Sequence, residues 1–263
     1  QEALASFGSD AMYLEKYLTT ARHIEFQVLA DSWGNAVHLF ERECSIQRRH
    51  QKLLEEAPSV ALTPEQRTTM GKRVADAAAA LGYEGAGTVE FLQDPSTGEL
   101  YFIEMNTRLQ VEHPVTEEIT GIDLVQAQIR IAAGERLWFT QEDVAITGHC
   151  IEVRLNAEDP DNDFRPAPGR VDVFEVGTVD RGRLRVDAAI VPGSRISPYY
   201  DSMIGKIIGW GADRTEAIAV VQQALAGLKV QGVPTTASLQ ADILAADDFA
   251  RGDLRVGVIP GRR

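Results

Sequence analysis

Polar side chains recur at every second position between Glu104 and Glu112, and this alternation is the most informative pattern in the chain. In an extended backbone alternate side chains share a face, so the polar residues would line one surface while the apolar residues between them anchor the other. The polar row is Glu104, Asn106, Arg108, Gln110 and Glu112. Its carboxylate, amide and guanidinium groups can bind metal ions or anions or move a proton. We therefore interpret this face as a functional site rather than as the solvated side of a half-exposed strand.

A second acidic strand precedes this row. The runs 88–92 and 100–104 have the composition of β-strands and are separated by a turn-rich sequence of Asp, Pro, Ser, Thr and Gly, which predicts a hairpin. Glu90 and Glu104 should then lie near each other, with the register left open by the sequence. Like charges that face each other across a hairpin are destabilising. A hard divalent cation such as Mg²⁺, bound by both carboxylates and the Asn106 amide oxygen, would remove this repulsion.

The rest of the pattern predicts an α+β protein. Thr63, followed by Pro64 and then by Gln66, has the features of a helix N-terminus, and Gly82 is expected to end that helix. The predicted helices cover residues 3–7, 63–81, 120–133, 213–228 and 236–246. Further strands are expected at residues 13–18, 25–30, 36–41, 148–155, 171–176, 183–186 and 204–210. The segment 160–169, rich in Pro and Asp, is expected to be a loop.

Composition restricts the possible partners. The chain has 263 residues and a net charge of −13, which argues against nucleic acid or an anionic membrane as a general partner. An anionic substrate would need a local concentration of cations, and the candidates are Arg108 and the cluster of Arg48, Arg49, His50 and Lys52.

The two cysteines show no zinc-site spacing, and no membrane-spanning run or signal peptide is apparent. We therefore expect an intracellular, cytoplasmic protein, or one of the mitochondrial matrix if the source is eukaryotic. Neither GxxxxGK[ST] nor a strand-linked GxGxxG occurs, so a P-loop or Rossmann nucleotide site is not supported.

Three long motifs and Glu90 together resemble biotin carboxylase, a branch of the ATP-grasp superfamily found in acetyl-CoA, propionyl-CoA and pyruvate carboxylases. The motifs are residues 43–52, 104–114 and 198–204, and the likeness extends from about Met12 to about Val256. It implies that residues 1–138 form the remainder of an ATP-grasp ATP-binding domain and that residues 148–257 form the biotin carboxylase C-terminal domain. The glycine-rich lid of the family would lie before residue 1.

The resemblance also implies a nucleotide and metal site. Its hinge for adenine would consist of Glu15, Lys16 and Leu18. Residues near the base and ribose would be His23, Gln47 and His50. The metal-binding pair would be Glu90 and Glu104, with Asn106 close to the same ions, which would be Mg²⁺ or Mn²⁺.

A bicarbonate pocket is implied beside the metal, consisting of Lys52, Arg108, Gln110 and the backbone of Val111. Arg108 suits this role because a planar guanidinium can hold a carboxylate-like anion through two hydrogen bonds. Glu112 resembles the general base that deprotonates bicarbonate. Arg154 resembles the residue that stabilises the enolate oxygen of biotin; without the resemblance it would be interpreted as a strand cation paired with Glu152 or Glu158.

The implied activity is ATP-dependent carboxylation of biotin on a carrier domain, with bicarbonate activated as carboxyphosphate. A carboxyltransferase component and a second copy in a homodimer are the other implied partners, fatty acid metabolism is one implied setting, and the final acyl acceptor stays open. One alternative is another ATP-grasp ligase, such as a carbamoyl-phosphate synthetase. The other is that this fragment alone is an inactive, non-catalytic module, because the lid would be absent.

Overall fold

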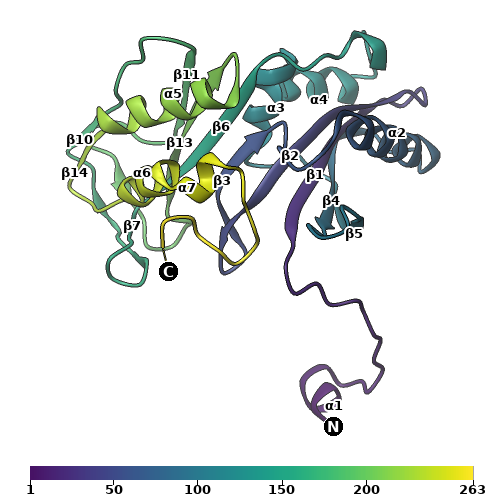
Figure 1. Cartoon of the computed structure of the whole chain (residues 1–263), viewed down its shortest axis with the longest axis horizontal. Helices are drawn as coiled ribbons and strands as arrows, with labels where there is room; N and C mark the ends of the chain where they lie inside the picture. Colours follow the sequence, from purple (N-terminus) through teal and green to yellow (C-terminus); the bar gives the residue numbers. More distant parts are fainter. Residues whose placement is uncertain (263) are drawn as a thin grey trace.

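The computed structural model describes residues 1–262. The body of the molecule is built around one eight-stranded antiparallel sheet (Figure 1). The strand order is β11-β13-β6-β3-β2-β1-β4-β5. The first strands are β1 (Arg22–Ala30), β2 (Ala36–Arg48), β3 (Gln51–Ala57), β4 (Gly85–Gln93) and β5 (Leu100–Asn106). The others are β6 (His149–Asn156), β11 (Arg183–Ala188) and β13 (Met203–Gly211). The predicted α+β class is confirmed.

Helices pack on this sheet through three main apolar clusters. Ile24, Phe26 and Val89 of β1 and β4 pack with Val74 and Ala78 of one helix. A second cluster joins β1 and β2 to another helix, and a third joins β3, β6 and β13 to the helices that follow them. The helices are α1 (Glu2–Phe7), α2 (Pro64–Ala80), α3 (His113–Thr120), α4 (Leu124–Ala132), α5 (Arg214–Ala226), α6 (Ala237–Ala245), α7 (Asp247–Ala250) and a 3₁₀ turn, η1 (Gln141–Asp143).

Short strands complete the second half of the chain. They are β7 (Glu158–Asp159), β8 (Arg165–Pro166), β9 (Gly169–Arg170), β10 (Val173–Glu175), β12 (Arg195–Ile196) and β14 (Lys229–Gln231). The predicted loop at residues 160–169 thus contains β8 and the start of β9. Within residues 1–262, none of the helices combines the length and the apolar character that crossing a bilayer would require.

The helix that follows Thr63 begins as the sequence predicts. Thr63 accepts a hydrogen bond from the Gln66 backbone N–H (3.2 Å), and the Gln66 side chain accepts one from the Thr63 N–H (3.0 Å). This reciprocal capping box, with Pro64 at the first helical position, fixes the start of α2. Asp213 likewise caps α5 by accepting from the Glu216 N–H (2.9 Å).

Three predictions about elements are wrong. Residues 13–18 are irregular rather than a strand, with residues 13–17 exposed, and Figure 1 shows this segment and α1 extending away from the sheet. The single helix predicted at residues 120–133 is two helices, because Gly121 ends α3 with φ of 74° and Asp123 caps α4. The extended row predicted from Glu104 to Glu112 ends at Asn106, where β5 stops.

One strand is missing from the sequence prediction. β3 carries Lys52, Glu55 and Glu56, and β2 carries Glu41, Arg42 and Glu43, so neither has the apolar character expected of a buried strand. Most of these charged side chains are nevertheless fully buried. They are stabilised there by one another, and this buried charge forms the floor of the candidate site.

Candidate active site

A cavity of about 790 Å³ opens between the β4–β5 hairpin, the β2–β3 hairpin and β6. Twelve of the fifteen residues with a predicted role line it. They are His23, Gln47, His50, Lys52, Glu90, Glu104, Asn106, Arg108, Gln110, Val111, Glu112 and Arg154. The structure therefore brings together residues that come from both halves of the sequence.

The three residues predicted to receive adenine lie elsewhere. Lys16 and Leu18 line a neighbouring hollow of about 440 Å³, and Glu15 is exposed outside both hollows. The Lys16 ammonium contacts the Tyr101 hydroxyl and lies 4.3 Å from the centre of its ring. Within residues 1–262, these positions are not brought into the main cavity.

The acidic hairpin forms one wall of the cavity. Glu90 of β4 and Glu104 of β5 are directly paired in the register of the two strands. The Asn106 amide nitrogen donates to Glu90 Oε1 (2.8 Å) and to Glu104 Oε1 (3.3 Å), so a donor group lies between the two carboxylates. This arrangement fits Mg²⁺, because both carboxylates offer oxygen ligands and rotation of the Asn106 side-chain amide would present a third.

Glu90 is ionised by its surroundings. Burial raises the pKa of this carboxyl, but the contact with His23 and the Lys52 charge outweigh burial and lower it to about 2. His23 Nε2 lies 2.7 Å from Glu90 Oε2, and the Gln47 amide nitrogen donates to His23 Nδ1 (2.8 Å), which leaves the ring proton on Nε2. His23, Glu25 and Glu90 also form a group compact enough to hold a metal ion.

A fully buried arginine that the sequence analysis missed organises the floor of the site. Arg42 donates to Glu25 Oε1 (2.6 Å) and to Gln110 Oε1 (2.9 Å), and it makes three further hydrogen bonds. Its other partners are Gln27 (2.7 Å), Thr116 (3.0 Å) and Thr88 (3.1 Å). Gln110 in turn donates to Glu90 Oε1 (2.6 Å), so it links the buried arginine to the acidic hairpin.

Lys52 and Arg154 hold Glu112 from two sides. Lys52 Nζ donates to Glu112 Oε1 (2.5 Å) and to Glu25 Oε2 (2.6 Å), while Arg154 Nη2 donates to Glu112 Oε2 (2.9 Å). Arg154 also pairs with Glu55 through its Nε (2.6 Å). The partners of Arg154 are thus Glu55 and Glu112, not the Glu152 or Glu158 considered from the sequence.

The remaining cations are divided between the cavity and the surface. Arg108 lines the cavity and is exposed; its guanidinium donates to the Leu109 carbonyl (3.2 Å), and no carboxylate within residues 1–262 pairs with it. His50 lies at the cavity edge in the β2–β3 turn. Arg48 and Arg49 instead bind Asp163. The cationic cluster predicted from residues 48–52 is therefore split.

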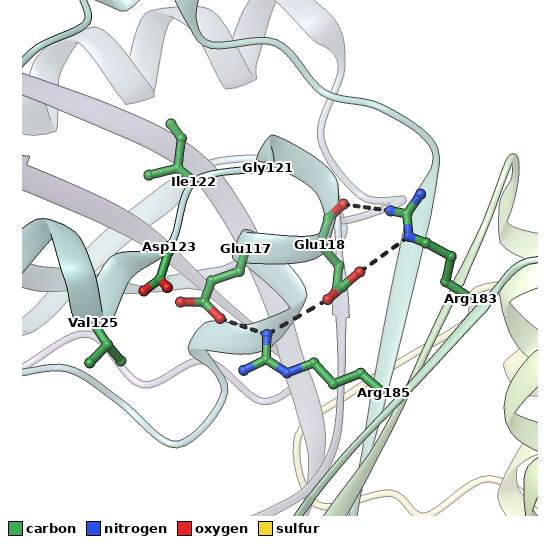
Figure 2. Close-up of a pocket in the computed structure, with 8 residues that line it drawn as sticks. All are labelled: Glu117, Glu118, Gly121, Ile122, Asp123, Val125, Arg183 and Arg185. Atoms are coloured by element: carbon green, nitrogen blue, oxygen red, sulfur yellow. Dashed lines mark hydrogen bonds and ion pairs between the residues drawn. The ribbon is translucent and has the colours of Figure 1, made fainter.

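A third hollow, of about 460 Å³, lies between α3 and β11 and contains none of the predicted site residues (Figure 2). Arg185 Nη1 pairs with Glu117 Oε2 (2.7 Å), and Arg183 donates to the Glu118 carbonyl (3.2 Å). These bonds tie α3, which begins directly after Glu112, to the edge strand of the sheet.

Two regions of the chain match known family models. Residues 1–140 match the ATP-binding domain of the carbamoyl-phosphate synthase L chain, and residues 152–260 match the biotin carboxylase C-terminal domain. The chain belongs to the biotin carboxylase family. A biotin carboxylase from Nostoc sp. is 52% identical over 260 residues, which cover 98% of this chain and 57% of that relative. Biotin carboxylase 1 from Bacillus subtilis is 50% identical over 255 residues, covering 96% of this chain and 56% of the relative.

Solved structures of the family have the same fold. The biotin carboxylase domain of a thermophilic 2-oxoglutarate carboxylase, bound to bicarbonate, gives a TM-score of 0.92 at 51% identity, covering 97% of this chain and 57% of that one. The Hydrogenobacter thermophilus domain dimer in complex with MgADP, ADP and bicarbonate gives 0.90 at 50% identity, with 97% and 55% coverage. This chain thus spans about half the length of the biotin carboxylases that it matches.

Proposed function

We propose that this chain forms part of an enzyme that carboxylates biotin on a carrier domain, using ATP and bicarbonate. The observation that carries the proposal is the convergence on one cavity of an acidic pair, a guanidinium that no carboxylate of residues 1–262 pairs with, and a carboxylate held by two cations. The bicarbonate and MgADP bound by the related domains support the same substrates here.

Glu90 and Glu104, with Asn106, would hold the divalent cation, which is Mg²⁺ or Mn²⁺. When bound, the cation supplies positive charge to the phosphates of ATP. His23, Gln47 and His50 line the cavity from β1 and the β2–β3 hairpin and would contact the base and ribose. Glu15, Lys16 and Leu18 remain proposed adenine contacts and would require the exposed segment 13–18 to move towards the cavity.

Arg108 and Lys52 would bind bicarbonate together with Gln110 and the Val111 backbone. Arg108 is suited to this because no internal carboxylate among residues 1–262 competes for it. Glu112 would accept the bicarbonate proton, and the deprotonated oxygen would attack the γ-phosphorus of ATP, releasing ADP and forming carboxyphosphate. Lys52 donates to Glu112 Oε1 (2.5 Å), so the carboxylate is oriented before the substrate binds.

Arg154 would act in the second half of the reaction. Carboxyphosphate breaks into CO₂ and phosphate, and phosphate removes the N1 proton of biotin. The resulting enolate oxygen is stabilised by the Arg154 guanidinium, and N1 attacks CO₂ to form carboxybiotin. Glu55 accepts from Arg154 Nε and Glu112 accepts from Arg154 Nη2. These two bonds orient the guanidinium and leave some of its N–H donors available to the enolate oxygen.

The partners follow from the same proposal. A biotin carboxyl carrier domain would bring biotin to the cavity, and a carboxyltransferase component would take the carboxyl group onward. We also propose a homodimer, because a related domain is described as a dimer in its complex with MgADP and bicarbonate.

The test is ADP formation by the full-length protein, which should require both bicarbonate and biotin or a biotinyl carrier. Arg108→Ala should lower this activity by about 10²- to 10³-fold, because a charge-stabilising contact is removed. Arg49→Ala is the matched control, since Arg49 is exposed and pairs with Asp163 outside the cavity; it should retain activity. Full turnover of Arg108→Ala, or ammonia serving as the acceptor in place of biotin, would contradict the proposal.

A further inference from the structure

The segment that joins β5 to α3 contains two consecutive peptide groups that are held from outside the cavity. The Gln110 carbonyl accepts from His113 Nδ1 (2.8 Å) and from the His113 backbone N–H (3.3 Å). The next carbonyl, that of Val111, accepts from Lys206 Nζ (2.6 Å). A carbonyl only accepts, so the proton of the His113 ring lies on Nδ1.

Because these two carbonyls are held, the direction of the N–H group in each of the same two peptide groups is also fixed. A trans peptide group is planar, and its N–H points opposite to its C=O. The Gln110 carbonyl therefore sets the direction of the Val111 N–H, and the Val111 carbonyl sets that of the Glu112 N–H. Neither N–H has a hydrogen-bond acceptor among residues 1–262, although Val111 and Glu112 both line the cavity.

The two holding side chains are themselves packed into the protein. The His113 and Lys206 side chains are only 14% and 9% exposed. His113 Nε2 lies 3.8 Å from Glu117, which Arg185 of β11 holds in turn (Figure 2). Burial lowers the pKa of His113 and outweighs the Gln110 hydrogen bond and the Glu117 charge, which raise it, so the neutral ring with its single donor is favoured.

We infer that His113 and Lys206 are positioning residues that hold the Val111 and Glu112 N–H groups as donors to a small oxyanion of carbon in the cavity. This inference rests on the proposed biotin carboxylase reaction, which already uses the Val111 backbone, and adds to it the two side chains, on β13 and α3, that support this backbone. It also gives a role to His113, a residue of the 104–114 motif that the proposed chemistry does not use.

Steady-state kinetics of the full-length protein test the inference. His113→Leu and Lys206→Met each remove one donor, and each should raise the KM for bicarbonate by about tenfold, the effect of losing one charge-assisted or buried hydrogen bond. The KM for MgATP should change less than about twofold, because neither side chain faces the acidic hairpin. His113→Asn, whose amide nitrogen can replace Nδ1, should restore most of the affinity for bicarbonate.

Glu152→Gln is the matched control, since Glu152 lies 3.7 Å from Lys206 but does not touch Val111. It should leave the KM for bicarbonate unchanged. An unchanged KM for bicarbonate in both donor-removing variants, or an equal rise in the KM for MgATP, would overturn the inference. An unmodified protein that forms no ADP with bicarbonate would instead overturn the proposed function.

Discussion

At the scale of single residues, the site depends on charged side chains that are buried but paired. Glu25 is fully buried and binds both Arg42 (2.6 Å) and Lys52 (2.6 Å). Burial raises the pKa of Glu25, but the charges of Lys52, Arg42 and His23 outweigh burial and lower it to about 2. Because the folded-state pKa lies below the usual value, the stabilisation is present above about pH 5 and is lost as the pH falls towards 2.

Glu25→Gln tests this pairing. A shift from 4.5 to about 2 corresponds to about 3 kcal/mol of stability at neutral pH, and removing one partner of a buried pair costs about 3–5 kcal/mol. The variant should therefore be less stable by this order at pH 7 and should show a shallower loss of stability between pH 5 and 2. Urea unfolding at several pH values measures both effects. Glu84→Gln, at an exposed position, is the control and should match the unmodified protein.

The pKa of Glu152 is shifted in the opposite direction to that of Glu25. It is fully buried, its two carboxyl oxygens have no hydrogen-bond partner among residues 1–262, and burial together with the Glu55 charge raises its pKa well above the ordinary value. A raised folded-state pKa gives stability that is fully present below about pH 4.5 and is lost as the pH rises.

Glu152→Gln should therefore stabilise the protein at pH 8 by about 1–3 kcal/mol, because an amide has no proton to lose. The difference from the unmodified protein should shrink towards pH 4. Unfolding free energies measured at the two pH values provide the test, and an equal difference at both would contradict this account of Glu152.

Site residues could be predicted from the sequence where polar side chains alternate with apolar ones. Glu90, Glu104 and Asn106 were predicted from their spacing to lie together, and the structure places them together. Glu25 and Gln27 alternate with apolar residues in the same way, so this signal was available. Arg42 gave no such signal, because a fully buried arginine is expected only once its partners on other strands and on α3 are known.

At the scale of elements, the helix N-termini could be predicted from the sequence, but the strand β3 and its buried partners could not. The helix starts at residues 63 and 213 were predicted correctly, because the Thr63 and Asp213 side chains cap their helices through local hydrogen bonds. β3 was missed because its buried carboxylates are paired with residues that are distant in sequence, Arg154 and His149, and these partners cannot be recognised from the sequence. The row from Arg108 to Glu112 looked extended, but it forms the turn into α3.

The α2 cap gives a prediction at this scale. Thr63→Ala should lower the free energy of unfolding by about 1 kcal/mol, because the side-chain half of the capping box is lost. Thr68→Ala, at an exposed position inside the same helix, removes a hydroxyl of the same kind and should be neutral or slightly stabilising. Thermal unfolding monitored by circular dichroism measures both; equal losses would show that the cap has no special contribution.

At the scale of the whole molecule, the two matched regions share one sheet and one charge network. β3 pairs with β6, Glu55 binds Arg154, and Glu56 binds Arg214 Nε (2.7 Å). The resemblance suggested a boundary in sequence, but the sequence could not show that the sheet continues across it. Long-range pairing depends on register and on partners more than 90 residues away.

This continuity predicts cooperative unfolding. Calorimetry should show a single transition, and Arg214→Met should lower its midpoint as a whole, because the buried Glu56 carboxylate loses a partner at a cost of about 3–5 kcal/mol. Two separated transitions, with only one shifted by the substitution, would show that the regions fold independently.

The central claim is that the cavity activates bicarbonate by phosphoryl transfer from ATP. The direct measurement uses bicarbonate labelled with ¹⁸O, MgATP, biotin and the full-length protein, with mass analysis of the phosphate released. Attack of a bicarbonate oxygen on the γ-phosphorus, followed by breakdown of carboxyphosphate, leaves one labelled oxygen in each phosphate. Phosphate that carries no label would mean that water is the nucleophile and would contradict the account.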